Sequence, residues 1–269
     1  MWATYDADPP RAGKRKAKKT EEIDAATFAR TRLGFAPDAK QMEVLQSKAK
    51  RGILNCSRQW GKSTVSAAKA VHRAYTRPGC LVLVASPCER QSREFVRKAS
   101  DMVRKLDIRP KGDGDNAISL LLPNGSRIVG LPGTEATVRG FSAVSLMLID
   151  EAARVRDRMY QALRPMLAVG DGDLWLMSTP CGQRGFFYGT WVNSRDGDDG
   201  WLRVSVPATE CERISQAFLE EERRVKTSYD FLQEYMCEFT GDGTEYFDRQ
   251  LIEDAFDDTI PELNIRPGR

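Results

Sequence analysis

The sequence of 269 residues has few of the side chains that build metal sites and disulfide frameworks. It contains one histidine, His72, and six cysteines that form no C-x-x-C pair. This scarcity argues against a structural zinc site and a disulfide scaffold, and it favours a reducing, intracellular setting. No apolar stretch approaches the roughly 20 residues that a membrane-spanning helix needs. The N-terminal segment also lacks an apolar core after its charges, so the sequence predicts neither a membrane anchor nor a secretory signal.

The net charge of +3 is unevenly distributed along the chain. Residues 11–19 carry six basic side chains and no acid, so we expect residues 1–22 to form a flexible basic arm. Such an arm could neutralise nucleic-acid phosphates, or it could be a solvated, disordered tail. Residues 242–262 carry eight acidic side chains against one base. We therefore expect residues 241–269 to form an acidic linker with a short helix.

Short apolar runs alternate with helical patterns over residues 23–240. This alternation is typical of an α/β domain with a mainly parallel central sheet and helices on both faces. Strands are predicted in GILNCS, CLVLVASP, VSLMLIDEA, DLWLMSTP and WLRVSVPA. The segment AISLLLPNGSRIVGLP predicts a β-hairpin insertion, because an Asn-Gly pair between apolar runs is a strong hairpin signal. The predicted helices include residues 25–33, 39–50, 89–106 and 156–167.

The segment CSRQWGKST, residues 56–64, resembles a phosphate-binding loop in which Cys56 replaces the usual first glycine. It follows a predicted strand and precedes a helical pattern, which is the order that a phosphate site needs. We expect Gly61 to let the backbone approach the phosphates and Lys62 to reach the β- and γ-phosphates. Ser63 offers a hydroxyl to Mg²⁺, and the helix N-terminus adds N–H dipoles that favour an anion.

Asp150 and Glu151 follow an apolar run that is typical of a buried strand. A carboxylate at that position can hold Mg²⁺ through water, and the adjacent one can polarise an attacking water. The alternative is an acidic loop that caps a helix beginning near Ala152. A phosphate loop upstream of the pair indicates nucleotide hydrolysis, and the second acid favours an ATPase over a kinase or a GTP switch.

The segment WLMSTP ends a third predicted strand. We expect this strand to lie beside the other two, where Ser178 and Thr179 could sense the γ-phosphate and pass its loss to a moving domain. The alternative is an ordinary strand exit, which Pro180 also fits.

In their order and spacing, these segments resemble the N-terminal ATPase domain of the large terminase subunit of tailed bacteriophages. Phosphate loops of this family keep an arginine near their start and need not have the leading glycine. The resemblance implies a RecA-like P-loop ATPase that assembles as a homo-oligomeric ring, usually a pentamer, and pumps double-stranded DNA into an empty capsid. It is carried by GFAPDAKQMEVL, SRQWGKST, VRGFSAVSLMLIDEAARV, LMSTPCGQRGFFY and SYDFLQEYMCEF.

The resemblance also implies roles for individual residues, with ATP and Mg²⁺ as the bound groups. Asp150 would hold the metal together with Ser63, and Glu151 would be the general base. Arg139, supplied to a neighbouring subunit, or Arg58, acting in cis, would neutralise the transition state; the alternative for each is a surface guanidinium paired with a carboxylate. Ser178, Thr179 and Pro180 would couple hydrolysis to movement. The residues expected at the nucleotide are Gln41 (at the adenine edge), Ser57, Arg58, Gln59, Trp60, Gly61, Lys62, Ser63 and Thr64.

The family context implies further partners and one departure. A portal protein and a small terminase subunit are the expected partners, and the host-cell cytoplasm is the expected location. Large terminases normally carry a C-terminal nuclease with an RNase H-like fold, but residues 241–269 show no buried-strand pattern that ends in an aspartate. We therefore expect no nuclease activity from this chain, whether a nuclease domain was removed or is a separate chain.

Two other functions remain as alternatives. A helicase-like DNA-remodelling ATPase shares the phosphate loop and the acidic pair, but the residues after Pro180 are too few for a second lobe. A small-molecule kinase or a regulatory scaffold is disfavoured by Glu151 and by the lack of an arginine-rich lid. Candidate DNA-backbone contacts, which could equally be a solvated helix face, are Arg97, Lys98, Arg104, Lys105, Lys111 and Arg127.

Overall fold

A computed structural model describes residues 23–131, 140–193 and 199–241 of the chain. Seven strands in these ranges form one sheet with the order β3-β4-β2-β5-β6-β1-β7. All neighbouring strands are parallel except β3 and β4, which form an antiparallel hairpin. The predicted mainly parallel sheet with a hairpin insertion is therefore confirmed. The strands are β1 (Arg51–Cys56), β2 (Leu81–Ala85), β3 (Ser119–Leu121), β4 (Arg127–Leu131), β5 (Val144–Asp150), β6 (Asp173–Ser178) and β7 (Trp201–Val206).

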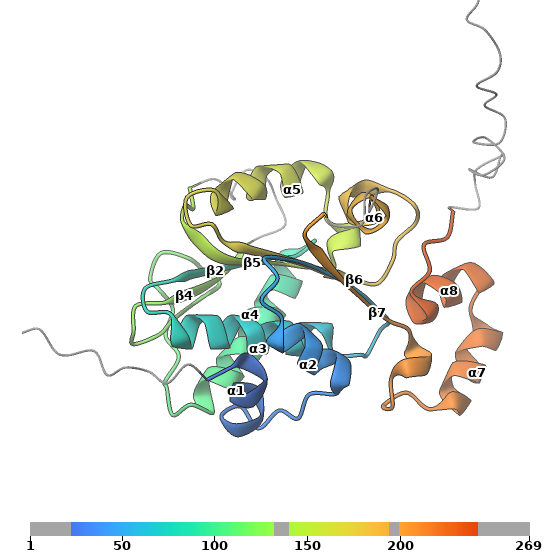
Figure 1. Ribbon diagram of the computed structural model, residues 1–269, viewed down its shortest axis with the longest axis horizontal. Coiled ribbons are helices and arrows are strands. Elements are labelled where there is room, and N and C mark those ends of the chain that lie inside the picture. The colour runs from blue at the N-terminus through green and yellow to red at the C-terminus, as the bar shows by residue number, and fades with distance from the viewer. Residues whose placement is uncertain (1–22, 132–139, 194–198, 242–269) are drawn as a thin grey trace, which may run out of the picture.

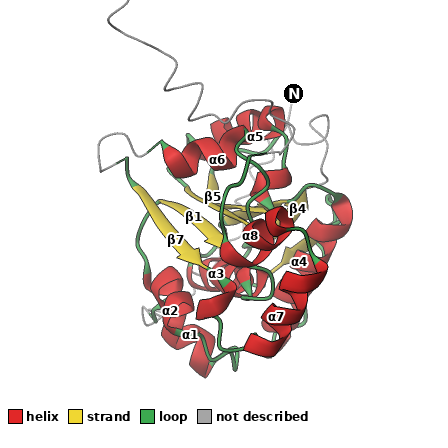
Figure 2. Cartoon of the chain, turned by 90° about the vertical axis from the view of Figure 1, so that its right-hand side faces the viewer, coloured by secondary structure: helices red, strands yellow, loops and turns green. Residues whose placement is uncertain are grey.

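Helices cover both faces of this sheet, as the alternating pattern predicts (Figure 1). One face packs against α1 (Ala25–Thr31), α2 (Ala39–Gln46), α3 (Lys62–Thr76) and α4 (Glu89–Arg104). The other face packs against α5 (Asp157–Leu163), α6 (Gly185–Val192) and the short 3₁₀ turns η2 (Ala152–Arg154) and η3 (Arg164–Leu167). The view in Figure 2 shows the strands between these two layers.

The last two helices lie beyond β7 as a small separate group (Figure 1). They are α7 (Gln216–Val225) and α8 (Ser228–Met236), which follow the 3₁₀ turn η4 (Ala208–Glu210). Leu219, Phe231 and Tyr235 form an apolar cluster of their own. A hydrogen bond of 2.7 Å from the Asn55 amide to the Cys237 carbonyl joins this group to β1.

Local capping explains where several helices begin and end. The Asp38 side chain accepts from the Gln41 N–H while the Gln41 side chain accepts from the Asp38 N–H, so α2 begins with a capping box. The helix ends at Gln46, earlier than the predicted residue 50, because Ser47 is extended. Helix α4 likewise ends at Arg104, two residues before the predicted end.

Close packing fixes a glycine in strand β1, which lies between β6 and β7. Strands β1 and β6 are adjacent, and Gly52 pairs with Trp175 in their register. A Cβ atom at Gly52 would lie 2.4 Å from the Trp175 ring, so no larger residue fits without displacing the indole. Trp175 is 1% exposed and is among the largest buried side chains.

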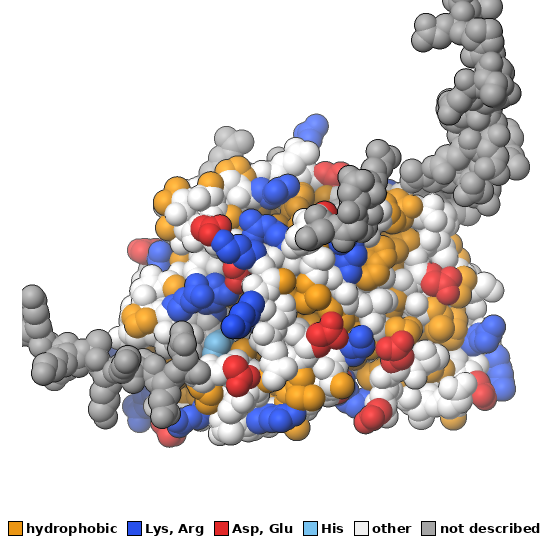
Figure 3. All heavy atoms as spheres, viewed as in Figure 1, with side chains coloured by type: hydrophobic (Ala, Val, Ile, Leu, Met, Phe, Trp, Pro, Cys, Tyr) orange, Lys and Arg blue, Asp and Glu red, His pale blue; other side chains and the backbone are white. Residues whose placement is uncertain are grey.

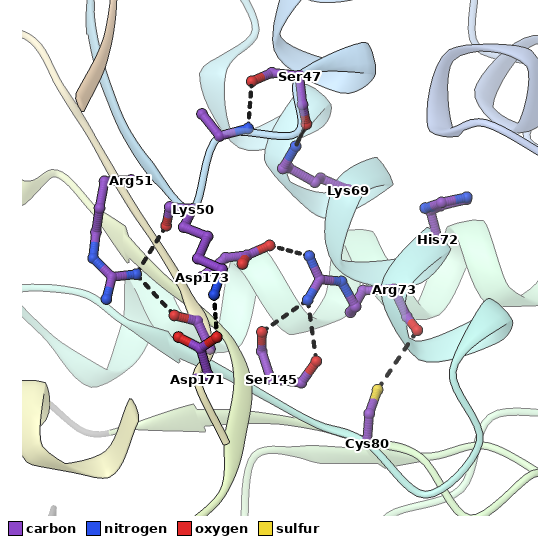
Figure 4. Close-up of polar contacts among 12 residues, drawn as sticks. Ser47, Lys50, Arg51, Lys69, His72, Arg73, Cys80, Ser145, Asp171 and Asp173 are labelled. Atoms are coloured by element: carbon purple, nitrogen blue, oxygen red, sulfur yellow. Dashed lines mark hydrogen bonds and ion pairs between the residues drawn. The ribbon is translucent and has the colours of Figure 1, made fainter. Parts of the chain in front are cut away.

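A polar network holds the amino ends of the strands together (Figure 4). Arg73 of α3 pairs with Asp173 at the start of β6 and donates to the Ser145 carbonyl at 2.8 Å. Lys69, one turn earlier, donates to the Val44 carbonyl at 3.0 Å and lies 4.2 Å from the Trp175 ring. Burial is the main reason why the pKa of Lys69 falls to about 8. The network ties α2 and α3 to the edge of the sheet opposite the phosphate loop.

Acidic, basic and apolar side chains are interspersed on the face drawn in Figure 3. None of the helices in the described ranges is both long enough and apolar enough to cross a membrane.

Candidate active site

The predicted phosphate loop connects the end of β1 to the start of α3, in the expected strand–loop–helix order. The backbone is left-handed at Gln59, with φ of 64°, and at Gly61, with φ of 100°. A Cβ atom at Gly61 would also approach the Gln41 amide nitrogen to 3.1 Å. Glycine therefore meets both a conformational and a steric requirement at the point where the loop enters the helix.

Lys62 is the first residue of α3, and its ammonium group curls back over the loop. Its Nζ donates to the Cys56 and Ser57 carbonyls, each at 3.1 Å. The side chain is only 7% exposed. A buried ammonium beside a helix N-terminus is a favourable site for an anion.

Ser63 lies next to the acid that ends β5. The Ser63 hydroxyl donates to Asp150 Oδ2 at 3.1 Å, and the Glu151 N–H donates to Asp150 Oδ1 at 3.1 Å. Burial, followed by repulsion from Glu151, raises the pKa of Asp150 to about 6. A divalent cation would offset this buried negative charge, and hydroxyl and carboxylate oxygens are the ligands that Mg²⁺ prefers.

The candidate metal ligands are the Ser63 hydroxyl and the Asp150 carboxylate. The described residues contain no group of three or more His, Cys, Asp or Glu side chains arranged to hold a metal ion. Mg²⁺ usually takes one or two protein ligands and completes its shell with water and phosphate oxygens. Ser63 and Asp150 fit that kind of site.

Glu151 follows Asp150 in a left-handed conformation, with φ of 51° and ψ of 44°. Such a conformation is costly for a residue with a side chain and tends to occur at functional sites. The η2 turn after it has no side-chain cap, so neither acid caps a helix at Ala152. Because β6 runs beside β5, Ser178 lies close by, and its hydroxyl donates to Glu151 Oε2 at 3.4 Å.

Another part of the cleft wall is built from the first turn of α2 and from Arg213, which precedes α7. The buried Gln41 amide donates to the Trp60 carbonyl at 2.9 Å. Arg213 donates to the same carbonyl and to Asp38 Oδ2, the latter at 3.2 Å. The Trp60 indole is 1% exposed and packs in the core, so Trp60 faces the cleft with its backbone.

These groups surround a cleft of about 510 Å³, which is in the range of small-molecule sites. Nine of the lining residues were predicted from the sequence, either at the nucleotide or as catalytic. The cleft is lined by Phe35, Gln41, Arg58, Gln59, Trp60, Gly61, Lys62, Ser63, Thr64, Lys98, Glu151 and Arg213.

Only Arg58 of the two candidate arginines lies among the described residues. Arg58 lines the cleft, is 54% exposed, and pairs with Glu234 of α8 at 2.8 Å. Arg139 lies outside the described residues.

The sequence did not predict three residues that contact the cleft or its acidic pair. They are Lys98, Arg154 and Arg213. Lys98 of α4 was predicted as a DNA contact, but its ammonium donates to the Thr64 hydroxyl at 3.2 Å in the cleft. Arg213 precedes α7, more than 150 residues from the loop carbonyl that it contacts. No local pattern in the sequence marks Lys98 or Arg213, because their placement depends on tertiary contacts.

Other predicted DNA contacts have partners on the protein surface. Arg97 pairs with Glu94 and Arg104 with Asp101, both within α4. Lys105 donates to the Leu33 carbonyl at 2.8 Å. This pattern favours the alternative of a solvated helix face for α4.

Comparison with known proteins shows which family this chain matches. Residues 53–254 match the family model for the N-terminal part of the terminase large subunit, T4likevirus-type. The large terminase subunits of Thermus phage G20c and Thermus virus P23-45 are each 25% identical to this chain over 251 residues. The match covers 80% of this chain and 51% of each relative, so the chain spans about half of their length.

Solved structures establish the fold. The ATPase domain of the Thermus phage P74-26 large terminase superposes with a TM-score of 0.71 at 22% identity, covering 81% of this chain and all of that domain. The large terminase of the thermophilic bacteriophage D6E, in complex with ADP, gives 0.65 at 16% identity over 75% of this chain and 53% of that one. The chain therefore belongs to the family of phage large terminase subunits, and its described part has the RecA-like fold of their ATPase domain.

Proposed function

We propose that this chain is the ATP-hydrolysing motor domain that translocates double-stranded viral DNA into a capsid. The observation that carries this proposal is the meeting of Lys62, Ser63 and the Asp150–Glu151 pair in one cleft at the carboxyl edge of the sheet. Related large terminases support it, since the D6E protein has been solved with both ADP and ATP-γ-S.

In the proposed reaction, the triphosphate lies along the phosphate loop. The Lys62 ammonium and the N–H groups at the start of α3 balance the phosphate charge. Ser63 and Asp150 would hold Mg²⁺, which when bound neutralises phosphate oxygens. Glu151 accepts a proton from the attacking water while the water oxygen bonds to the γ-phosphorus and the bond to the ADP oxygen breaks.

Gln41 is proposed to recognise the base, and Ser57, Arg58, Gln59, Trp60 and Thr64 to complete the nucleotide site. For Trp60 this contribution comes from its backbone, because its side chain is buried. Arg58 in cis, or Arg139 from a neighbouring subunit, stabilises the charge that develops on the γ-phosphate.

Coupling to movement is proposed to run through Ser178, the last residue of the strand beside β5, and through Thr179 and Pro180, which follow it. A working motor would be a homo-oligomeric ring, with a pentamer as the expected number, acting with a portal protein and a small terminase subunit in the host cytoplasm. The basic arm of residues 1–22 and nearly all of the acidic linker of residues 241–269 lie outside the described residues, and both remain predictions.

The proposal is tested by measuring ATP hydrolysis with and without double-stranded DNA. A motor domain should turn over slowly when monomeric and faster when DNA or assembly brings subunits together. Lys62→Ala is the matched loss-of-binding variant, and the exposed Lys40→Ala is its control.

Two outcomes point to the alternatives. A helicase-like remodeller would separate the strands of a forked duplex at the expense of ATP. A small-molecule kinase would be indifferent to DNA and would transfer phosphate to an added acceptor. The absence of Lys62-dependent hydrolysis under every condition would remove the motor proposal.

A further inference from the structure

Arg154 connects the proposed general base to the proposed coupling residues. One terminal nitrogen of its guanidinium, Nη1, lies 3.0 Å from Glu151 Oε2 and 3.1 Å from Thr179 Oγ1. The same nitrogen lies 3.5 Å from the Thr179 carbonyl. Arg154 therefore contacts the ends of both β5 and β6.

The local backbone explains why an arginine at this position reaches Glu151. The left-handed Glu151 reverses the chain into η2, where the Arg154 N–H donates to the Glu151 carbonyl at 2.9 Å. A 3₁₀ turn has three residues per turn, so the side chains at its positions i and i+3 lie one above the other. Ala152 is fully buried inside this turn and anchors it against the core.

The contacts restrict how the Glu151 carboxylate can turn. Its Oε2 accepts from Arg154 and, at 3.4 Å, from the Ser178 hydroxyl. None of the described residues donates to Oε1. Two donors on one oxygen fix the carboxylate plane and leave the other oxygen for the water that is to be deprotonated.

A stabilising role explains this arrangement less well. The Arg154 and Glu151 side chains are 33% and 27% exposed, and ion pairs open to solvent contribute little to folding. A single guanidinium nitrogen instead joins the residues that follow two adjacent strands, an arrangement that a role in stability alone does not require.

We propose that Arg154 is a positioning residue for hydrolysis, which orients Glu151 and links its orientation to Thr179 at the end of β6. This inference rests on the proposed function, because it takes Glu151 as the base. A displacement of the carboxyl end of β6 would then reorient the Glu151 carboxylate. A change in the Glu151 carboxylate would in the same way displace Thr179.

The test compares Arg154→Ala, Arg154→Lys and the exposed Arg158→Ala of α5 in steady-state hydrolysis and in ATP titration. We expect Arg154→Ala to lower kcat on the order of 10- to 100-fold, because misplaced catalytic groups lose rates of this size. ATP affinity and the melting temperature should change little, and Arg154→Lys should recover part of kcat. Arg158→Ala should match the wild-type protein.

A double-mutant cycle with Thr179→Val distinguishes a link from two separate effects. If Arg154 acts through its contact with Thr179, the double variant should be no slower than Arg154→Ala alone. Additive losses, or a kcat of Arg154→Ala within about twofold of wild type, would overturn the inference. A wild-type protein that hydrolyses no ATP would instead overturn the proposed function.

Discussion

The side-chain oxygens of Ser63 and Asp150 are 3.1 Å apart and hydrogen-bonded, although 87 residues separate them in the sequence. The bond joins the first turn of α3 to the last residue of β5. It therefore brings the phosphate loop and the acidic pair to one point, where a carboxylate is buried beside a second negative charge.

Replacing Asp150 with asparagine should stabilise the metal-free protein at neutral pH. The pKa of Asp150 is raised from 3.8 to about 6, so the folded state binds more protons than the unfolded state between these values. As pH rises through this window, the buried carboxyl ionises in the folded state and the free energy of unfolding falls. Above the window the total loss is of order 1–3 kcal/mol. Asp150→Asn removes that cost while abolishing magnesium-dependent hydrolysis.

Urea unfolding in EDTA at pH 4 and pH 8 measures this effect. Asp150→Asn should be the more stable protein at pH 8 and about equal to wild type at pH 4. The surface variant Asp101→Asn should show no such difference. A stability change that is the same at both pH values would contradict the explanation from buried charge.

Glu151→Gln should separate nucleotide binding from hydrolysis. The amide keeps the size of the side chain but cannot accept a proton, so turnover should fall on the order of 10²- to 10⁴-fold. Affinity for ATP should stay near that of wild type, as measured by titration with a fluorescent analogue. The exposed Glu220→Gln of α7 is the control, and normal single-turnover rates in Glu151→Gln would exclude Glu151 as the base.

Arg213→Ala should raise KM with little change in kcat. Arg213 contacts the Trp60 carbonyl and Asp38 on the wall of the cleft rather than the acidic pair, so it should act on ground state and transition state alike. The Arg213 side chain is 49% exposed, so its loss should cost only about 0.5–1.5 kcal/mol, or roughly 2- to 10-fold in affinity. Arg224→Ala on the exposed surface of α7 is the matched control. A lower kcat at unchanged KM would assign Arg213 to the chemical step instead.

Gly52→Ala should destabilise the fold without touching the cleft. The added methyl group would lie 2.4 Å from the Trp175 ring, inside a strand pair that is buried on both sides. Overpacking of this kind typically costs about 1–3 kcal/mol. Gly112→Ala is the control, since its added atom would meet only Ser119 Oγ at 3.7 Å. Equal urea midpoints for the two variants would contradict the packing argument.

The order of the strands along the chain and the phosphate loop were predictable because each has a local signal. The four residues before Asp150 are all apolar, and the Asn-Gly turn at residues 124–125 predicts the hairpin that the structure contains. Parallel pairing then requires the ends of β5 and β6 to meet, which places Ser178 beside Glu151.

The rest of the candidate site depends on contacts that leave no local pattern. Lys98 was predicted to face DNA because a charged residue on an amphipathic helix has the same spacing whether it faces solvent or a cleft. The burial of the Trp60 indole could not be predicted from the sequence either, because residues in a loop have no periodicity that indicates which side chains point inward. The Glu151–Arg154 pair could have been suspected from the three-residue spacing, but only if a 3₁₀ turn had been predicted there.

The hydrogen bond from Lys69 to the Val44 carbonyl has a consequence for the proposed nucleotide site. The Lys69 ammonium links the carboxyl end of α2 to the middle of α3. Gln41 and Lys62 lie in the first turns of the same two helices. In the proposed nucleotide complex, the Gln41 amide at the base and the Lys62 ammonium at the phosphates are therefore held by two helices that are joined to each other. A base that displaces Gln41 is then expected to displace the phosphate loop as well.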